Sequence, residues 1–348
     1  MSKLHPKIIS LGYSVPPYAY NQEQIFISLR YSPHYRRMFS ESGIETRHFC
    51  VPLSRIKELS FQEQQEQYAK WSVQLSYEAV IKCLDERSVD TIGCITYGSC
   101  TGLMPGPSAS HFIGAMLGLS PSTYHSNIIG QGCESGFPGL KRAADYVQSS
   151  HKTALVVNCE LCDLTYFPEE KGMDEADDHS LLRANAIFGD AAIACLVGHD
   201  SDWRHPTIID TETYTDYAYL NDLGYRWQDG RLRAVISRRV PDLAAIVVSK
   251  AIEQLLNRVK INKTQIKWWV IHAAGNAVID SIKEKIGLSE EQASLSRETL
   301  RQFGNTSSTS VGLSGKSLMS EKIAQDDYAM MLSIGPGITG GATLLKFE

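Results

Sequence analysis

The chain has 348 residues, of which 43% are hydrophobic and 21% charged, and its formal net charge at pH 7 is −5. This balance is ordinary for a globular protein, and the lack of any long run of Lys and Arg argues against a nucleic-acid partner. No apolar run approaches the roughly 18 residues that span a bilayer, and residues 1–6 have no signal-peptide pattern. The eight cysteines are expected to be thiols, as in a reducing compartment. We therefore expect a cytoplasmic protein without a membrane or nucleic-acid partner.

Apolar, β-branched segments alternate along the chain with segments of helical periodicity. In chain order, the predicted elements are a strand at 7–11, a helix at 61–86, a strand at 91–96, a helix at 134–147, strands at 153–157 and 191–197, a helix at 243–259, and strands at 266–271, 328–334 and 342–347. Alternation of this kind predicts a layered α/β fold with buried strands. Residues 214–233 are aromatic and irregular, and they are either the rim of an entrance or an ordinary surface loop.

The second half of the chain repeats the pattern of the first. In each half a strand leads into a polar turn, and a glycine-containing loop then opens a helix. These two loops carry Cys133 and Asn305. We therefore divide the chain into an N-terminal half, residues 1–200, and a C-terminal half, residues 201–348, whose functional loops face each other across a pseudo-twofold axis.

Cys133 is the candidate nucleophile. It follows Gly130-Gln131-Gly132 and precedes an amphipathic run, and glycines allow a tight turn and the close approach of a substrate. A helix N-terminus favours thiolate over thiol, and its backbone N–H groups can hold an oxyanion. Nucleophilic acyl transfer requires these features. A buried structural cysteine in a glycine-rich turn explains the segment equally well.

His272 and Asn305 are the candidate helpers of that cysteine. His272 ends a predicted buried strand, where α/β proteins gather their sites, although a lone histidine there is more often a structural hydrogen-bonding residue. Asn305 opens a helix, so it is either an N-cap or a donor to a thioester oxygen. Because Cys, His and Asn follow the same order in some cysteine proteases, an unrelated hydrolase is a further alternative.

Short motifs spread over nearly the whole chain add a resemblance to these signals. They are LGYSVPP at 11–17, SGIETRH at 42–48, MPGPS at 104–108, GQGC at 130–133, FGDAA at 188–192, WVIH at 269–272, FGNTSS at 303–308 and GPGIT at 335–339. In this combination the chain resembles the thiolase-fold condensing enzymes, in particular the type III polyketide synthases (chalcone-synthase-like) and ketoacyl-ACP synthase III.

The resemblance implies a thiolase-like five-layered αβαβα fold, built from two duplicated halves, and a homodimer. It implies that Cys133 is acylated by a CoA or acyl-carrier-protein thioester, and that His272 and Asn305 stabilise the thiolate and a thioester enolate. With malonyl-CoA as extender, the product of this Claisen condensation is a β-ketoacyl chain, open or closed to a pyrone or an aromatic ring. No metal and no cofactor are implied, since the CoA or phosphopantetheine thioesters are substrates.

Five further residues are expected to contact the substrate. Phe188 matches the family's residue between the CoA site and the cavity, and the others lie in segments expected to line or back that cavity. They are Ser99, Cys162, Thr165 and Gly337.

Other features limit what the resemblance implies. Glu134 follows the nucleophile, where its carboxylate would oppose thiolate formation if it pointed inward, or would stabilise the helix N-terminus instead. The chain is shorter than plant members around residues 200–242, so the substrates and the cyclisation stay open. A single Cys159 and Cys162 pair is not expected to bind a metal. Within the fold, transfer of the acyl group to an alcohol or amine, and a non-catalytic carrier-binding subunit, are the alternatives.

Overall fold

The computed structural model describes residues 5–102, 104–166, 179–228 and 231–348. Its central element is a mixed sheet with the strand order β11-β12-β13-β8-β1-β7-β6-β4-β5. The strands of the first half are β1 (Lys7–Ser14), β4 (Ile92–Gly98), β5 (Tyr124–Ile128), β6 (Thr153–Glu160) and β7 (Ala191–Gly198). Those of the second half are β8 (Thr207–Thr215), β11 (Ile266–Ile271), β12 (Tyr328–Gly335) and β13 (Thr339–Lys346).

The helices divide between the same two halves. Those of the first half are α1 (Gln22–Leu29), α2 (Arg36–Ser40), α3 (Phe61–Leu84), α4 (Ala109–Leu117), α5 (Gly136–Ser150) and α6 (Ser180–Ile187). Those of the second half are α7 (Val240–Val259), α8 (Asn276–Ile286), α9 (Glu290–Phe303) and α10 (Ser310–Leu318). Two short ribbons complete the fold, β2 (Tyr18–Tyr20) with β3 (Arg47–Phe49) and β9 (Leu223–Gln228) with β10 (Arg231–Ile236).

The two halves of the sheet have the same pairing pattern. β4 and β6 are parallel, β6 is antiparallel to β7, and β7 is antiparallel to β1. In the same way β11 and β12 are parallel, β12 is antiparallel to β13, and β13 is antiparallel to β8. The half-sheets meet where Lys7 is paired with Thr207. The duplicated architecture predicted from the sequence is therefore confirmed, while a domain boundary at residue 200 stays a prediction.

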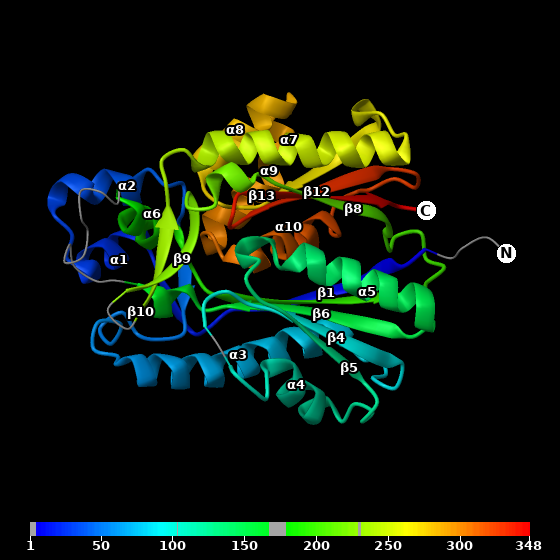
Figure 1. Ribbon diagram of the computed structural model, residues 1–348, viewed down its shortest axis with the longest axis horizontal. Coiled ribbons are helices and arrows are strands. Elements are labelled where there is room, and N and C mark those ends of the chain that lie inside the picture. Colours follow the sequence, from blue (N-terminus) through cyan, green and yellow to red (C-terminus); the bar gives the residue numbers. More distant parts are fainter. Residues whose placement is uncertain (1–4, 103, 167–178, 229–230) are drawn as a thin grey trace.

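Five layers are visible in Figure 1. α3 and α4 cover the outer face of the first half-sheet, and α7, with α8 beside it, covers the outer face of the second. Between the half-sheets lie α5, which packs on β4 and β6, and α10, which packs on strands of both halves. The αβαβα order places the N-termini of α5 and α10 in the middle of the molecule.

Helix α3 illustrates how the sequence builds an outer layer. Ser60 caps its N-terminus, and a capping box joins Ser60 to Glu63. Leu75, Ala79 and Cys83, four residues apart, are all buried on the face that packs against β1 and β7. This buried stripe, together with the cap, explains the long helix that the sequence predicts at 61–86.

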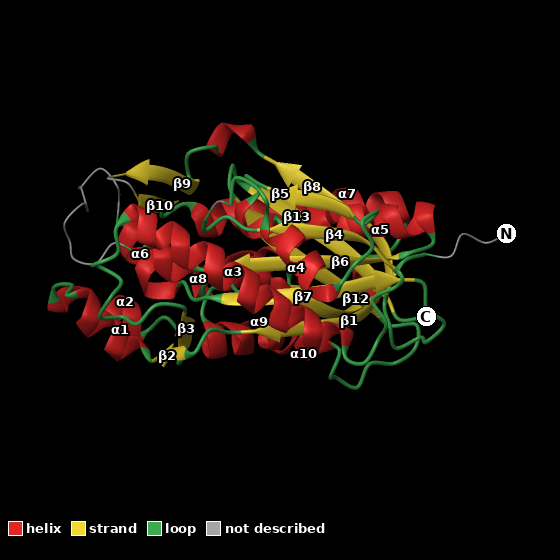
Figure 2. Cartoon of the chain, turned by 90° about the horizontal axis from the view of Figure 1, so that it is seen from below, coloured by secondary structure: helices red, strands yellow, loops and turns green. Residues whose placement is uncertain are grey.

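Every predicted strand is present, but the sequence did not predict β5 and β8. β5 is an edge strand with one buried residue, Ile128, and β8 is half-buried over most of its length. The expectation of irregular structure at 214–233 is wrong for much of that stretch, because β9 and β10 pair as an antiparallel hairpin beside α6 (Figure 2). Residues 229 and 230 of the stretch lie outside the described residues.

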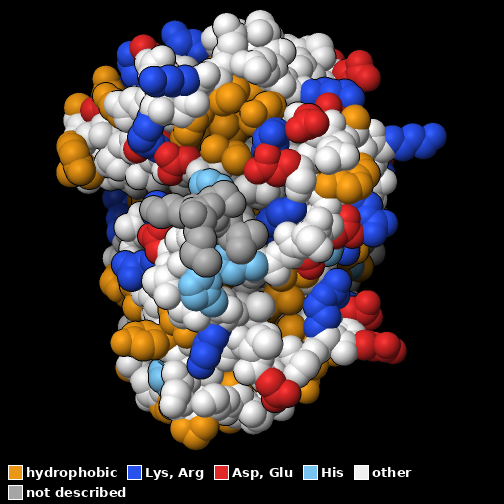
Figure 3. Space-filling view, turned by 90° about the vertical axis from the view of Figure 1, so that its right-hand side faces the viewer, with side chains coloured by type: hydrophobic (Ala, Val, Ile, Leu, Met, Phe, Trp, Pro, Cys, Tyr) orange, Lys and Arg blue, Asp and Glu red, His pale blue; other side chains and the backbone are white. Residues whose placement is uncertain are grey.

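The surface carries both signs of charge. On the face near the N-terminus, Lys and Arg side chains are interspersed with Asp and Glu, and several His side chains are exposed near the centre of the view (Figure 3). In the described part of the chain, none of the helices combines the length and the apolar character needed to cross a membrane.

Candidate active site

Cys133 lies in a 3₁₀ turn, Gly132–Glu134, just before α5. Its side chain is buried, and Gly132 has a φ of +53°, in the left-handed region that favours glycine. A Cβ atom on Gly132 would lie 2.3 Å from the ring of Pro336, so a larger residue does not fit between the turn and the loop after β12. The glycine before the nucleophile therefore lets these two loops pack together.

The turn before α10 brings the predicted helpers together. Ser307 donates a hydrogen bond to the Cys133 Sγ (3.1 Å), and its own backbone N–H donates to the Asn305 Oδ1 (2.9 Å). Three residues further on, Ser310 is hydrogen-bonded to the His272 Nδ1. Within the described residues no hydrogen bond joins Cys133 to His272 directly, so serines of one turn, residues 305–310, connect both to the loop that carries Asn305.

The side chain of Asn305 keeps part of its hydrogen-bonding capacity free. Its Nδ2 donates to the carbonyl oxygen of Ala274 (3.2 Å), in the loop that follows His272. An amide nitrogen has two N–H donors, so one donor remains for a ligand. The backbone of Asn305 also forms a bridge with Phe188, which is buried.

Burial controls the charges of the thiol and the imidazole. It raises the pKa of Cys133 to about 12, although the hydrogen bond from Ser307 acts in the opposite direction. It lowers the pKa of His272 to about 3. Burial thus favours a thiol and a neutral imidazole in this state of the site, against the thiolate that a helix N-terminus by itself would favour.

Glu160 is a buried carboxyl group that the sequence analysis did not propose for the site. It accepts hydrogen bonds from the Cys100 backbone N–H (3.0 Å), the Thr101 hydroxyl (3.0 Å) and the hydroxyls of Ser307 and Ser308. Burial raises its pKa, and the hydrogen bonds lower it. Glu160 is the last residue of β6, next to the loop of Cys100, and α/β proteins often carry site residues at strand ends. This position was the one feature of the sequence that could have indicated Glu160 as a site residue.

A cavity of about 410 Å³ opens beside this network. Among the residues predicted to contact the substrate, Ser99 and Gly337 line it. Cys162 and Thr165 are buried in the turn after β6, and their neighbour Leu164 forms the wall. The substrate-binding roles of these residues stay predictions.

The β9–β10 hairpin forms one side of the cavity. Leu223, Gly224, Tyr225 and Trp227 of β9 line it, with Leu232 of β10. The sequence left open whether residues 214–233 form the rim of an entrance or an ordinary surface loop. The position of the hairpin at the cavity agrees with the rim.

Another cavity, of about 370 Å³ and largely apolar, has two lining residues, Ile187 and Ala274, that are hydrogen-bonded to Asn305. Met38 of α2, Arg183 and Ile187 of α6, and Ala274 with Asn276 line it. Because Ala274 accepts the hydrogen bond from Asn305, and Ile187 adjoins Phe188, this cavity lies next to two residues of the candidate site, although neither of them lines it.

Glu134 points neither toward the site nor to the end of the helix. A Cβ on Gly341 would lie 2.9 Å from its Oε1, which places the carboxyl group against β13. The Oε1 atom is buried and has no hydrogen-bond partner among the described residues. Burial raises the pKa of Glu134 to about 8, so the group is neutral at pH 7 and does not oppose the thiolate. The expected capping role is also absent, since α5 has no side-chain cap.

Comparison with known proteins agrees with this architecture. The family model of the chalcone and stilbene synthases, N-terminal domain, matches residues 36–201, and that of the C-terminal domain matches residues 223–347. A putative chalcone synthase of Bacillus subtilis (strain 168) is 28% identical over 366 aligned residues, which cover 98% of each chain. A 1,3,6,8-tetrahydroxynaphthalene synthase of Streptomyces griseus is 27% identical over 316 residues, with 87% of this chain and 80% of that one covered.

Solved structures give the same result for the fold. The crystal structure of 1,3,6,8-tetrahydroxynaphthalene synthase from Streptomyces coelicolor A3(2), a bacterial type III polyketide synthase, matches with a TM-score of 0.90 at 22% identity and covers 98% of this chain and 99% of that one. Since both family models match in order and together extend over most of the sequence, the chain belongs to the chalcone and stilbene synthases.

Proposed function

We propose that the protein is a type III polyketide synthase in which Cys133 accepts an acyl group and joins it to the carbon of a decarboxylated malonyl thioester. The observation that carries this proposal is the turn at residues 305–310, which is hydrogen-bonded to both Cys133 and His272 beside a cavity of about 410 Å³. The proposal assigns the roles of nucleophile, base and amide donor to Cys133, His272 and Asn305.

In the first step Cys133 is acylated. The buried thiol has to lose its proton, and the neutral His272 is available as acceptor at its Nε2, because its Nδ1 is bonded to Ser310. The thiolate sulfur then attacks the carbonyl carbon of the acyl thioester, and the bond from that carbon to the CoA sulfur breaks. The leaving thiolate takes up the proton from His272, so charge and atoms balance.

In the second step a malonyl thioester loses carbon dioxide and leaves an enolate. The free N–H of Asn305 and an N–H on His272 stabilise the negative charge on the enolate oxygen. The Ser310 hydroxyl can accept from Nδ1 or donate to it, so His272 can present either a lone pair or an N–H at Nε2. The enolate carbon attacks the acyl carbon on Cys133, and the Cys133 thiolate leaves.

We propose that the two cavities hold the two parts of a thioester substrate, the pantetheine arm in one and the acyl chain in the other. We assign the 370 Å³ cavity to the pantetheine arm of CoA, or to the phosphopantetheine of a carrier protein, because Ile187 and Ala274 in its wall are hydrogen-bonded to Asn305. We assign the 410 Å³ cavity to the growing polyketide chain, with Ser99, Gly337 and the walls near Cys162 and Thr165 around it. Phe188, which follows Ile187 of the smaller cavity, is assigned to the passage between the two cavities, as the resemblance implies. The reaction as proposed has no step that needs a metal or another cofactor.

We further propose a homodimer in the cytoplasm. β5 is an unpaired sheet edge, and large apolar side chains are exposed near it, namely Phe112, Met116, Tyr124 and Ile129. A second copy of the chain would cover both. All eight cysteines are free thiols, which agrees with a reducing compartment.

Two measurements test the proposal. Intact-protein mass spectrometry after incubation with a panel of acyl-CoA and acyl-carrier thioesters should show one acyl group on Cys133. Carbon dioxide should be released from labelled malonyl-CoA, with formation of a β-ketoacyl product. An unmodified Cys133 with every thioester would overturn the proposal. Acylation followed by transfer to an alcohol or amine, without carbon dioxide, would favour an acyltransferase instead.

A further inference from the structure

One arginine side chain is completely enclosed beside the loop of Asn305. Arg47, the first residue of β3, has no exposed surface. Its carbon stem packs on two glycines, since a Cβ atom would lie 3.4 Å from the stem if placed on Gly189 and 2.9 Å from it if placed on Gly304. These glycines adjoin Phe188 and Asn305, which form an isolated parallel bridge. The arginine therefore lies against both segments of that bridge.

The guanidinium group of Arg47 is hydrogen-bonded to oxygen atoms of several other elements. Its Nη1 donates to the carbonyl oxygens of Asn185 (2.7 Å) and Phe188 (2.9 Å). The same Nη1 donates to the Tyr166 hydroxyl (2.6 Å), which in turn donates to the Phe188 carbonyl. Its Nη2 donates to the Oε1 of Gln22 (2.5 Å). Hydrogen bonds from a charged donor are stronger than neutral ones, so the Phe188 carbonyl is held firmly from this side.

Gln22, the first residue of α1, extends these bonds to the wall of the 370 Å³ cavity. Its Nε2 donates to the Ser42 hydroxyl (2.6 Å) and to the Ala186 carbonyl (2.8 Å). Both Ser42 and Ala186 line that cavity, as does Asn276, whose Nδ2 donates to the Ser42 carbonyl (3.0 Å). The wall of the smaller cavity is therefore joined to Arg47 by an unbroken series of hydrogen bonds.

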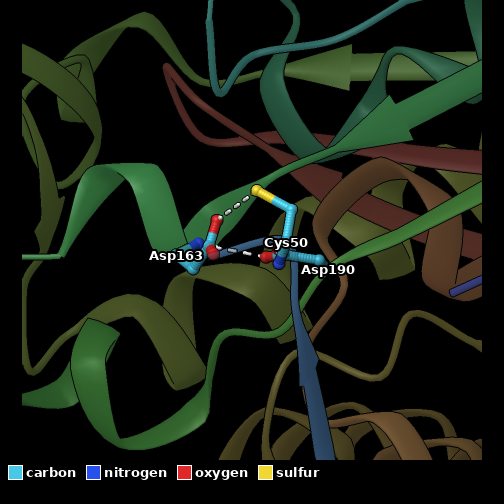
Figure 4. Close-up of side chains that lie close together, drawn as sticks. All are labelled: Cys50, Asp163 and Asp190. Atoms are coloured by element: carbon cyan, nitrogen blue, oxygen red, sulfur yellow. Dashed lines mark hydrogen bonds between the residues drawn. The ribbon is translucent and has the colours of Figure 1, made fainter. Parts of the chain in front are cut away.

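The backbone that follows Arg47 is fixed by two buried carboxyl groups. Asp190 accepts from the Cys50 N–H (2.8 Å), and its own N–H donates to the His48 carbonyl (2.9 Å). Asp163 accepts from the Cys50 thiol (3.2 Å), and Figure 4 shows these three side chains together. Since β3 cannot shift without breaking these bonds, the position of Arg47 is set by the fold before any substrate binds.

The segment of Phe188 is also bonded to the loop of Asn305. The Asn305 N–H donates to the Ile187 carbonyl (2.8 Å), and the Gly189 N–H donates to the Asn305 carbonyl (3.0 Å). The Asn305 side chain is the one with an N–H left for a ligand, and its Oδ1 accepts from the Ser307 N–H. A displacement of residues 187–189 would therefore displace this amide as well.

We propose that Arg47, together with Gln22 and Tyr166, is a positioning residue that holds Phe188 and the Asn305 amide in fixed places relative to the smaller cavity. Because Arg47 has no exposed surface, it acts through Asn305 and not on the substrate. The catalytic half of this inference rests on the proposed function, in which Asn305 is the donor to the enolate. The holding of the backbone stands on the hydrogen bonds alone.

The first test replaces Arg47 by methionine, which keeps an unbranched stem and removes every bond of the guanidinium. We expect kcat for carbon dioxide release from malonyl-CoA to fall by about tenfold or more, because a small displacement of a group in the site is costly. Alkylation of Cys133 by iodoacetamide, which does not need Asn305, should stay within about threefold of wild type. Arg204→Met, at an ion pair with Asp202 where the arginine side chain is 73% exposed, is the matched control and should keep both rates.

The second test does not depend on activity. The N–H groups of Gly189 and Asn305 both donate within the bridge, so hydrogen–deuterium exchange should find them protected in wild type. We expect Arg47→Met to exchange about tenfold faster or more in the peptides that contain these two residues, with no change in the peptides of β6. A purely stabilising role of Arg47 would not single out these peptides or the release of carbon dioxide.

Two results would overturn the inference. One is unchanged exchange at Gly189 and Asn305 in folded Arg47→Met. The other is a kcat for carbon dioxide release that equals wild type or falls no further than the rate of Cys133 alkylation. If Arg47→Met does not fold, Gln22→Met decides by the same two criteria, with changes of about threefold or more expected. If wild type itself releases no carbon dioxide, the proposed function fails, and the exchange measurement still tests whether Arg47 holds the bridge.

Discussion

The starts of α5 and α10 occupy equivalent places in the two halves of the fold, and they differ in what they offer a substrate. Each follows a 3₁₀ turn in the middle layer. The first start presents a single reactive atom, the Sγ of Cys133, held close to Pro336 through Gly132. The second presents a row of polar side chains, including Asn305, Ser307 and Ser310, each hydrogen-bonded to another part of the site.

This difference shows how two copies of one fold unit can carry different parts of a reaction. The start of α5 supplies the group that forms the bond, and the start of α10 supplies the groups that stabilise charge. The first half needs only space and a thiol, and glycine provides the space. The second half needs donors in fixed directions, and the bonds within its turn and to the loop of Ala274 fix them. Changes at the two helix starts should therefore have different kinetic signatures.

The largest effect is expected for Cys133→Ala. Without the sulfur no acyl-enzyme forms, so condensation should fall by about a thousandfold or more. Intact-protein mass spectrometry with an acyl-CoA should show no added mass. Cys94→Ala, which removes a buried thiol far along the sheet, is the matched control and should keep both properties. An acylated Cys133→Ala protein would place the nucleophile elsewhere.

A smaller but still large effect is expected for Asn305→Ala. Loss of one donor to a developing oxyanion typically costs about 100- to 1000-fold, so release of carbon dioxide from malonyl-CoA should fall by this amount. Acylation of Cys133, which does not need the enolate, should stay within about tenfold of wild type. Equal losses in both steps would mean that the second helix start does not act separately from the first.

Local sequence patterns predicted the strands and helices of the fold better than the hydrogen-bond partners of the side chains in the site. Apolar strands such as β6 and β12 were visible as runs, and the duplication predicted that the loops of Cys133 and Asn305 approach each other. β8 was not predicted, because its mixture of Thr, Asp and Glu has no apolar run. Its place in the sheet comes from pairing with β13 and β1, which only the folded chain brings together.

The polar connections in the site could not be predicted for the same reason. Ser307, Ser310 and Glu160 are bonded to partners far away in the sequence, and the position of Glu160 at a strand end is the one sequence feature that indicates any of them. The direction of the Cys133 pKa could not be predicted either, because the burial that raises it depends on packing from both halves. The sequence shows which titratable residues are present, whereas their burial in the folded chain sets the direction of their pKa shifts.

An intermediate effect is expected for Ser307→Ala, which removes the bond that connects the two helix starts. That bond lowers the pKa of Cys133, so its loss should raise the pKa further and reduce the thiolate fraction. Hydrogen bonds to charged groups contribute about 1.5–3 kcal/mol, so alkylation of Cys133 by iodoacetamide at fixed pH should slow by about tenfold to a hundredfold. In wild type and variant alike the rate should rise with pH. Ser317→Ala, on α10 away from the site, should alkylate at the wild-type rate.

The smallest effect is expected at Glu134, which neighbours the nucleophile in sequence but not in function. Its pKa in the folded chain is about 8, above the usual value of about 4.3, so the folded state keeps a proton that the unfolded state loses. Stability should therefore fall as the pH rises through this interval, by up to about 1.4 kcal/mol per pH unit from this group. Glu134→Gln should remove that slope in urea unfolding measured from about pH 5 to pH 8, while acylation of Cys133 stays within about threefold of wild type. A large loss of acylation in Glu134→Gln, with an unchanged slope, would instead make this carboxyl part of the nucleophile's own chemistry.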